Sequence, residues 1–196
     1  AAPAVLELEE VPALVKGVRA LAPQAASVIG MGAQSGVFAT GFAHGSAPEF
    51  AMNESCAAGT GSFFEDQMQR LGLPLESYSD LVARAQSVPR LSGRCSVFAK
   101  TDIQPLINEG ATQADLAVSI FQAVVNQTIS GLACGKPIRG TVAFLGGPLH
   151  FLTELKAAFI RTLKLTPETT VDPENSHLFA AMGAALEAKD GEAAVL

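Results

Sequence analysis

The chain has 196 residues, a net charge of −6 and 48% hydrophobic residues, while only 16% of its residues are charged. This composition supplies enough apolar side chains for a folded core, excludes intrinsic disorder, and contains no basic block of the kind that binds nucleic acid. No run approaches the roughly 18 apolar residues of a membrane span, the acidic N-terminus is unlike a signal peptide, and three cysteines make no disulfide framework. We therefore expect one cytoplasmic domain over residues 1–196, with neither nucleic-acid nor membrane partners.

The first half of the chain predicts a helix, three strands and a glycine-rich loop. Apolar residues recur at helical spacing over 8–22, which predicts a helix within a lead-in segment of residues 1–25. Three short β-rich runs lie between glycines and prolines and predict strands at Ala26–Gly30, Val37–Phe42 and Glu49–Met52. A loop of small residues and two helices are expected next, at 53–61, 62–71 and 74–86.

The second half predicts helices and strands in alternation. Thr112, followed three residues later by Asp115, is a helix start signal and predicts a long helix over 113–131. Thr141–Leu145 is a short apolar run between glycines and predicts a buried strand. The other expected elements are strands at Cys95–Phe98 and 169–172 and helices at 101–109, 150–164 and 176–188. This order predicts an α/β fold, a ribonuclease-H-like mixed sheet with flanking helices.

The three cysteines are candidate reactive or metal-binding groups. Cys56 precedes a predicted helix, whose N-terminus would favour a thiolate. Cys95 has two neighbouring cations with the same effect, Arg94 and Lys100. The alternative is that both, together with Cys134, are small buried hydrophobic residues. The chain has no C-x-x-C motif, and two ligands cannot complete a tetrahedral metal site, whereas two thiolates from each of two chains could.

Glycine-rich turns are candidates for binding a nucleotide. Cys56-Ala-Ala-Gly-Thr-Gly61 would let backbone amides approach an anion, but it lacks the ending of a P-loop, and a plain strand-to-helix turn explains it equally well. Gly146 and Gly147 follow a predicted buried strand, where a ribose or base could lie close to the backbone. This too is a common strand-to-helix connection, and Gly30–Gln34 forms a similar turn after the first predicted strand.

The remaining polar residues show no recognisable catalytic arrangement. The histidines His44, His150 and His177 are scattered along the chain and have no metal-ligand spacing, so surface or satisfied core positions are expected. No Ser-His-Asp arrangement can be argued from the sequence.

Several segments together resemble a known family: Asn53–Phe63, Arg94–Ala99, Phe144–Gly147 and Ser176–Ala185. They look like the activator of 2-hydroxyacyl-CoA dehydratases, the BadF/BadG/BcrA/BcrD ATPase family. That family belongs to the actin, sugar-kinase and heat-shock-chaperone ATPase superfamily. The resemblance extends from about Val11 to about Ala188, and parts of it most resemble the long, multidomain activator-like proteins.

The resemblance implies an iron–sulfur site and a dimer. In such activators one [4Fe–4S] cluster bridges two subunits, each of which supplies two cysteines. Cys56 and Cys95 match those positions, so the resemblance implies a homodimer formed through the cluster loop, with Cys134 structural. The implied function couples ATP to transfer of one low-potential electron to a 2-hydroxyacyl-CoA dehydratase or a related CoA-substrate enzyme.

The resemblance also implies a site for ATP or ADP with Mg²⁺. Gly32, Ala33 and Gln34 would lie near the phosphates. Gly146 and Gly147 would approach the adenosine.

Two departures from the family pattern concern hydrolysis. The family's second phosphate loop reads Asp-Ile-Gly-Gly-Gln-Asp, whereas Gly30-Met-Gly-Ala-Gln-Ser35 lacks both carboxylates that would order Mg²⁺ and water. The phosphate-1 loop, Asp-x-Gly-Ser-x-x-x-Lys, does not occur in the chain. The chain thus resembles the second lobe of an activator-type module. The alternative functions are a degenerate, non-hydrolysing scaffold module of a larger activator-like protein and a kinase-like phosphotransferase, for which the sequence supplies no catalytic base.

Overall fold

The computed structural model describes residues 8–42, 47–53, 60–74, 77–91, 96–134, 136 and 138–195. Its strands form one sheet in the order β3-β2-β1-β4-β5, with bounds β1 Ser27–Met31, β2 Gly36–Thr40, β3 Glu49–Met52, β4 Val142–Leu145 and β5 Thr170–Val171. β2 pairs antiparallel with β1 and β3, whereas β4 pairs parallel with β1 and β5. This mixed sheet with flanking helices confirms the predicted α/β, ribonuclease-H-like fold.

The register of the sheet brings two strand ends together. β1 and β4 run parallel, and Gly30 lies opposite Leu145. The turns that follow these two strands therefore leave the sheet at the same carboxyl edge, which is where α/β folds place ligands.

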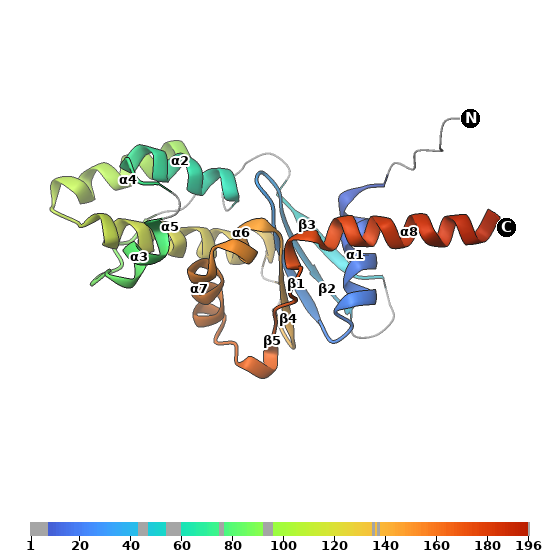
Figure 1. Cartoon of the computed structure of the whole chain (residues 1–196). Coiled ribbons are helices and arrows are strands. Elements are labelled where there is room, and N and C mark those ends of the chain that lie inside the picture. The colour runs from blue at the N-terminus through green and yellow to red at the C-terminus, as the bar shows by residue number, and fades with distance from the viewer. Residues whose placement is uncertain are drawn as a thin grey trace, which may run out of the picture.

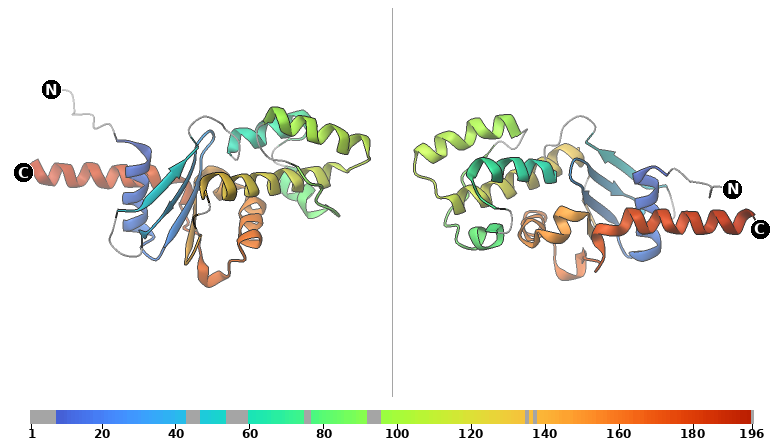
Figure 2. Two further views of the ribbon diagram at one scale, coloured as in Figure 1. Left: turned by 180° about the vertical axis from the view of Figure 1, so that it is seen from behind. Right: turned by 45° about the horizontal axis from the view of Figure 1, so that its top comes forward.

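Helices cover both faces of the sheet, each over its own apolar cluster (Figures 1 and 2). α1, Glu10–Leu21, and α8, Phe179–Val195, cover one face. On the other face α6 and α7 lie next to the sheet, and α5 runs away from it toward an outer group of helices, α2, α3 and α4 (Figures 1 and 2). One large apolar cluster extends through all of them, and their bounds are α2 Gly61–Leu71, α3 Tyr78–Ala83, α4 Ser96–Asn108, α5 Gln113–Gln127, α6 Gly147–Phe151 and α7 Thr153–Leu163. None of the helices in the described part of the chain is both long and apolar enough to span a bilayer.

α1 and α8 pack so closely that their backbones touch. A Cβ added to Gly183 would lie 1.8 Å from the carbonyl oxygen of Ala13, and one added to Gly17 would lie 2.5 Å from that of Phe179. Only glycine fits at such a crossing. The crossing fixes α8 against the start of the chain and so sets the position of the turn before Phe179.

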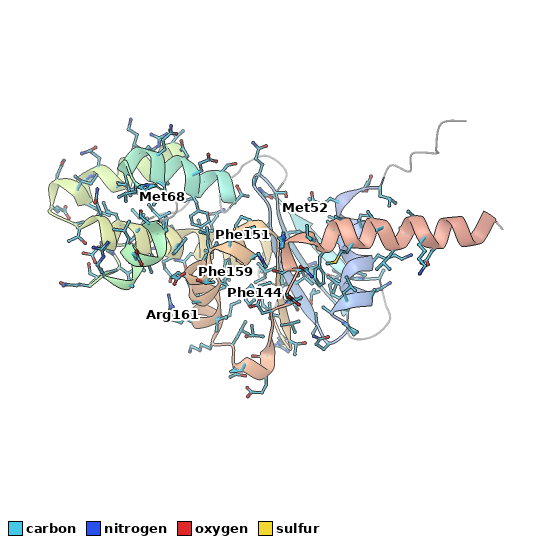
Figure 3. All side chains as sticks on the ribbon, viewed as in Figure 1. Met52, Met68, Phe144, Phe151, Phe159 and Arg161 are labelled. Atoms are coloured by element: carbon cyan, nitrogen blue, oxygen red, sulfur yellow. The ribbon has the colours of Figure 1, made fainter. Side chains whose placement is uncertain are left out.

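Aromatic side chains pack the helical layer on the other face. The ring of Tyr78 is 1% exposed and lies 4.2 Å from the ring of Phe121, and its hydroxyl donates to the carbonyl of Ala117 at 2.9 Å. Burial raises the pKa of the Tyr78 hydroxyl. Phe144 on β4 and Phe159 on α7 continue this packing toward the sheet (Figure 3).

The predicted strand at Cys95–Phe98 is wrong. Ser96–Phe98 form the first turn of α4, which continues through the predicted helix 101–109, and Cys95 lies outside the described residues. Val97 and Phe98 have high strand propensity, but they are 64% and 62% exposed, and the described sheet offers them no partner strand.

Other helix boundaries differ by up to about two turns, and the predicted helix 74–86 is shortened to α3. The predicted helix 150–164 is divided at Leu152 into α6 and α7, and α5 ends in a π-helical turn, Thr128–Leu132. The predicted helix 176–188 begins as a 3-10 turn, η5 Ser176–Leu178, and continues to Val195. The Thr112 start signal is confirmed, because its side chain accepts from the Asp115 N–H at 3.1 Å.

Candidate functional site

A cavity of about 150 Å³ lies at the carboxyl edge of the sheet, beside α1 and α8. Three of the predicted nucleotide residues, Gly32, Gly146 and Gly147, line it together. The described lining residues do not include Ala33 or Gln34 of the same β1–β2 turn. Because complete small-molecule pockets measure roughly 300–1,000 Å³, this cavity has room for part of a ligand only.

The β4–α6 turn is a rigid wall of the cavity with one open position. Gly146 has φ +95°, and a Cβ added there would lie 2.1 Å from the carbonyl oxygen of Met31. Its N–H donates to the carbonyl of Ser176 at 3.0 Å. A Cβ at Gly147 would meet nothing within 4 Å, so the backbone of Gly147 is open to an approaching ligand.

The β1–β2 turn is hydrogen-bonded to the start of α2. The carbonyls of Gly32 and Ala33 accept from the N–H groups of Gly61 and Ser62 at 3.0 and 2.7 Å. The first amides of a helix have no partner within the helix, and here two of them bind the turn. The turn and α2 are therefore one connected unit.

Asn53 holds the same turn from the other side. Its side-chain oxygen accepts from the Gly36 N–H, its side-chain amide donates to the Gln34 carbonyl at 3.3 Å, and its own N–H donates to the Gly36 carbonyl at 3.2 Å. The segment between Asn53 and α2 contains Cys56, which lies outside the described residues. Both ends of that segment are thus anchored on the β1–β2 turn. Sequence reasoning missed this role of Asn53, which it noted only as the first residue of a segment that resembles the family.

Two histidines that are separate in the sequence meet beside the β4–α6 turn. The rings of His150 and His177 lie 4.1 Å apart, and His150 Nδ1 is 2.8 Å from Ser176 Oγ. Ser176 and His177 also line the cavity. No sequence signal could reveal this pair, because packing of η5 against α6 brings it together. His44 lies outside the described residues.

Carboxylates are scarce around the cavity. Among the described lining residues, Glu10 on α1 supplies a carboxylate. Gly30 and Ser35 occupy the two positions at which the family's second phosphate loop has aspartate. A Cβ added to Gly30 would lie 2.5 Å from Val37 Cγ1, so Val37 occupies the space that an aspartate at position 30 would need. Mg²⁺ in phosphate sites commonly uses one or two carboxylates together with the phosphates. The described lining fits such an ion only if Glu10 supplies the carboxylate.

The predicted cluster ligands Cys56 and Cys95 lie outside the described residues. Cys134 is exposed and its thiol donates to the Gly131 carbonyl at 2.8 Å. Within the described part of the chain, no three His, Cys, Asp or Glu side chains are placed to hold a metal ion.

The fold is that of ATPases of the actin and sugar-kinase type. The chain belongs to the BadF/BadG/BcrA/BcrD ATPase family, whose family model matches residues 5–188. It is 28% identical over 188 residues to the activator of lactoyl-CoA dehydratase from Anaerotignum propionicum, covering 93% of this chain and 68% of that protein. The 2-hydroxyisocaproyl-CoA dehydratase activator of Clostridioides difficile is 24% identical, covering 94% and 67%.

Solved structures agree with this assignment. The crystal structure of component A of the Acidaminococcus fermentans (R)-2-hydroxyglutaryl-CoA dehydratase has a TM-score of 0.81 at 25% identity, covering 92% of this chain and 67% of that one. The Clostridium difficile 2-hydroxyisocaproyl-CoA dehydratase activator with bound ADPNP has a TM-score of 0.83 at 24% identity, covering 100% and 73%. These comparisons confirm the family and the fold. The predicted roles of the glycines and cysteines stay predictions.

Proposed function

We propose that this chain is the second lobe of an ATP-dependent iron–sulfur activator. It would couple ATP to the transfer of one low-potential electron to a 2-hydroxyacyl-CoA dehydratase or a related CoA-substrate enzyme. The relatives above are activators of such dehydratases, and one of them was crystallised with ADPNP. The observation that carries the proposal is the set of hydrogen bonds between the β1–β2 turn and both ends of the Cys56 segment.

This connection is what coupling between a nucleotide and a cysteine site requires. A phosphate bound at Gly32 would meet a turn whose carbonyls hold Gly61 and Ser62 and whose far side is held by Asn53. Any displacement of the turn therefore changes the hydrogen bonds at both ends of the Cys56 segment. A nucleotide site and a cysteine segment without shared contacts could not influence each other so directly.

Cys56 and Cys95 would supply two of the four thiolates of a [4Fe–4S] cluster, which when bound would carry the transferred electron. In the sequence, Cys95 directly precedes α4 and Cys56 shortly precedes α2. α2 and α4 pack side by side with both N-terminal ends toward the sheet (Figures 1 and 2). A cluster with four thiolates is anionic, and neighbouring helix N-termini would stabilise it. This arrangement supports the proposed ligand pair.

A shared cluster would make the activator a homodimer with a twofold axis, since each subunit then contributes the same pair of ligands. The exposed apolar side chains of Val97 and Phe98, on the first turn of α4, are suited to such an interface. The partner would cover them.

A second candidate function is a non-hydrolysing scaffold module of a larger activator-like protein. The observation that favours it is the loss of both carboxylates of the phosphate loop, together with Val37 in the space beside Gly30. Such a module would keep the fold, and could keep the cluster, without cleaving ATP.

The test of the iron–sulfur proposal is the iron content of anaerobically reconstituted protein. We expect iron in the unaltered chain and its loss in Cys56→Ser and Cys95→Ser, whereas the matched control Cys134→Ser retains it. Light scattering should show twice the monomer mass in the reconstituted form. Absence of iron after reconstitution, or equal loss in Cys134→Ser, contradicts the proposal. ATP turnover is measured in a chain that includes the first lobe. If that chain binds iron but does not hydrolyse ATP, the scaffold function is the correct one.

A further inference from the structure

We infer that the last turn of the α5 helix has two backbone registers, and that Leu132 couples its register to the position of the β1–β2 turn. This last turn is η3, the π-helical turn Thr128–Leu132 that continues directly from α5. It behaves in this way with or without nucleotide or iron, so a two-register turn goes beyond the proposed function. η3 would then be a conformational link between the β1–β2 turn and the outer helices.

A π-helical turn contains one residue more than an α-helical turn. Its N–H groups bond to the carbonyl five residues earlier instead of four. If the turn changes to α-helix, the extra residue passes into the chain after it, and the side chains of the turn rotate by about 100° about the helix axis. Both registers keep the backbone hydrogen-bonded, so the contacts around η3 decide which of them is populated.

Two features of η3 oppose the π register. Thr128 is 4% exposed, and its Oγ1 has no hydrogen-bond partner among the described residues. The hydroxyls of Ser119 and Ser130 in the same helix each donate to the carbonyl four residues earlier, at 2.7 Å. Cys134, shortly after η3, has φ +47°, a left-handed conformation that is unfavourable for a residue with a Cβ. A buried hydroxyl without a partner and a left-handed cysteine both destabilise this register.

Packing of Leu132 on the sheet offsets these costs. Leu132 is 8% exposed and belongs to the large apolar cluster. A Cβ added to Gly36 would lie 3.1 Å from Leu132 Cδ1, so this methyl group lies directly on the backbone of β2. The ion pair between Lys136 and Glu49, 2.6 Å apart, also ties the chain after η3 to β3, but both side chains are exposed and such pairs contribute little. The Leu132 contact is therefore the main support of the π register.

Gly36 connects η3 to the β1–β2 turn. Its N–H and its carbonyl both bond to Asn53, whose side chain also binds the Gln34 carbonyl. If the turn moves away from Leu132, the π register loses its main support and η3 shifts toward the α register. A shift of η3 in turn removes Leu132 from Gly36, and the two effects are equal because coupling is reciprocal. Since α5 runs from this point to the outer helices and packs on α2 and α3, the shift reaches them (Figures 1 and 2).

Relaxation-dispersion NMR on the 196-residue chain detects a minor register directly. We expect the amides of η3, Gly36 and Asn53 to exchange on the microsecond-to-millisecond scale with one common rate. Leu132→Ala should raise the minor population at least about tenfold, because it removes the contact that supports the π register. The control Leu81→Ala removes a leucine that is also 8% exposed and lies in the same apolar cluster on α3. It should leave the minor population unchanged.

Two further variants should act in the opposite direction. Cys134→Gly relieves the left-handed conformation and should lower the minor population about tenfold. Its control is Lys164→Gly, which relieves the same conformation, φ +55°, at the end of α7 and should not affect η3. Thr128→Val removes the hydroxyl that has no partner and should also lower the minor population.

Flat dispersion profiles in both the unaltered chain and Leu132→Ala would mean that η3 has a single register, which overturns the inference. Exchange in η3 at a rate that Gly36 and Asn53 do not share would overturn the coupling. If Leu132→Ala does not fold, Cys134→Gly and Thr128→Val still decide the matter, because both should stabilise the π register. No nucleotide or iron enters these measurements, so the proposed function fails or stands separately.

Discussion

The β1–β2 turn and the β4–α6 turn leave the sheet at the same edge and line the same cavity, but they are held in different ways. The β1–β2 turn is bound through hydrogen bonds to Asn53 and to the first amides of α2. The β4–α6 turn has one backbone hydrogen bond, from the Gly146 N–H to the Ser176 carbonyl, and passes so close to the backbone of Met31 that only glycine fits at position 146. The β1–β2 turn is thus held mainly by hydrogen bonds to Asn53 and α2, and the β4–α6 turn mainly by close packing against the end of β1.

This difference suggests a division of tasks. Hydrogen bonds can lengthen or exchange partners at modest cost, so a turn held by them can pass on a displacement. A turn packed this closely against backbone atoms has little room to shift, so it is suited to present a fixed surface such as the backbone of Gly147. The β1–β2 turn would therefore respond to the phosphates, and the β4–α6 turn would position the nucleoside.

We expect the largest loss of stability from a side chain added at Gly146 in the β4–α6 turn. Gly146→Ala would place a Cβ 2.1 Å from the Met31 carbonyl oxygen at a φ of +95°, so we expect a loss of about 4 kcal/mol in the free energy of unfolding. Gly147→Ala, next to it, meets nothing within 4 Å and should change stability by less than about 0.5 kcal/mol. Urea unfolding followed by circular dichroism measures both. Equal stability of the two variants would show that the turn is not closely packed.

A smaller effect is expected from restoring the family carboxylate. Gly30→Asp would push against Val37 Cγ1, 2.5 Å from the added Cβ, and should cost about 2–3 kcal/mol. Combining it with Val37→Ala provides room, so the double variant should be more stable than the sum of the single effects by about 1–2 kcal/mol. Strictly additive unfolding energies would mean that Val37 does not occupy the space of the missing carboxylate.

The sheet was predictable because its signals are local. Three apolar runs that lie between glycines or prolines each form a strand within a residue or two of the expected bounds: Ala26–Gly30, Val37–Phe42 and Thr141–Leu145. Val97 and Phe98 carry the same apolar, strand-prone composition but form a helix. Their state depends on whether a partner strand is available, which no window of sequence records.

The sequence predicted the candidate site only at positions where the backbone itself lines the cavity. Gly32, Gly146 and Gly147 were recognisable because glycines after predicted strands indicate that the backbone closely approaches a ligand or another part of the chain. Asn53 and His177 carry no such mark, since their importance comes from residues far along the chain that they meet only in the fold. Parallel pairing of β1 with β4 is what joins the two turns into one cavity.

Weakening the hydrogen-bonded turn should have a moderate effect. Asn53→Ala removes the side-chain bonds to the Gly36 N–H and the Gln34 carbonyl, and we expect a loss of about 1–2 kcal/mol in stability. Amide hydrogen exchange should increase for Gly61 and Ser62 if the turn and α2 are one unit. The control Asn108→Ala makes the same chemical change at an exposed position and should leave both measurements unchanged. Faster exchange at Gly36 alone would show that the turn is not linked to α2.

We expect the smallest effect on stability from Asp115, whose charged side chain holds a loop as the neutral side chain of Asn53 does. Asp115 on α5 also holds a loop by accepting backbone N–H bonds, from Gln86 and Ser87, each at 2.8 Å. The bonds from Ser87 and then Gln86 hold the pKa of the Asp115 carboxyl below its ordinary value. The stabilisation is therefore complete above the unfolded-state pKa of about 3.9 and is lost as the pH falls through the lower folded-state value. Asn53 does not titrate, so its contribution should not depend on pH.

Urea midpoints between pH 7 and pH 2.5 test this contrast between the two contacts. Asp115→Asn keeps the acceptor oxygen and loses the charge, so the variant should be less stable than the unaltered protein at pH 7, with a difference that shrinks below pH 4. The difference caused by Asn53→Ala should stay constant over the same range, because a neutral amide binds no proton there. A constant difference for Asp115→Asn as well would mean that the charge of Asp115 adds nothing to the two backbone bonds. Both loops would then be held by the same neutral interaction.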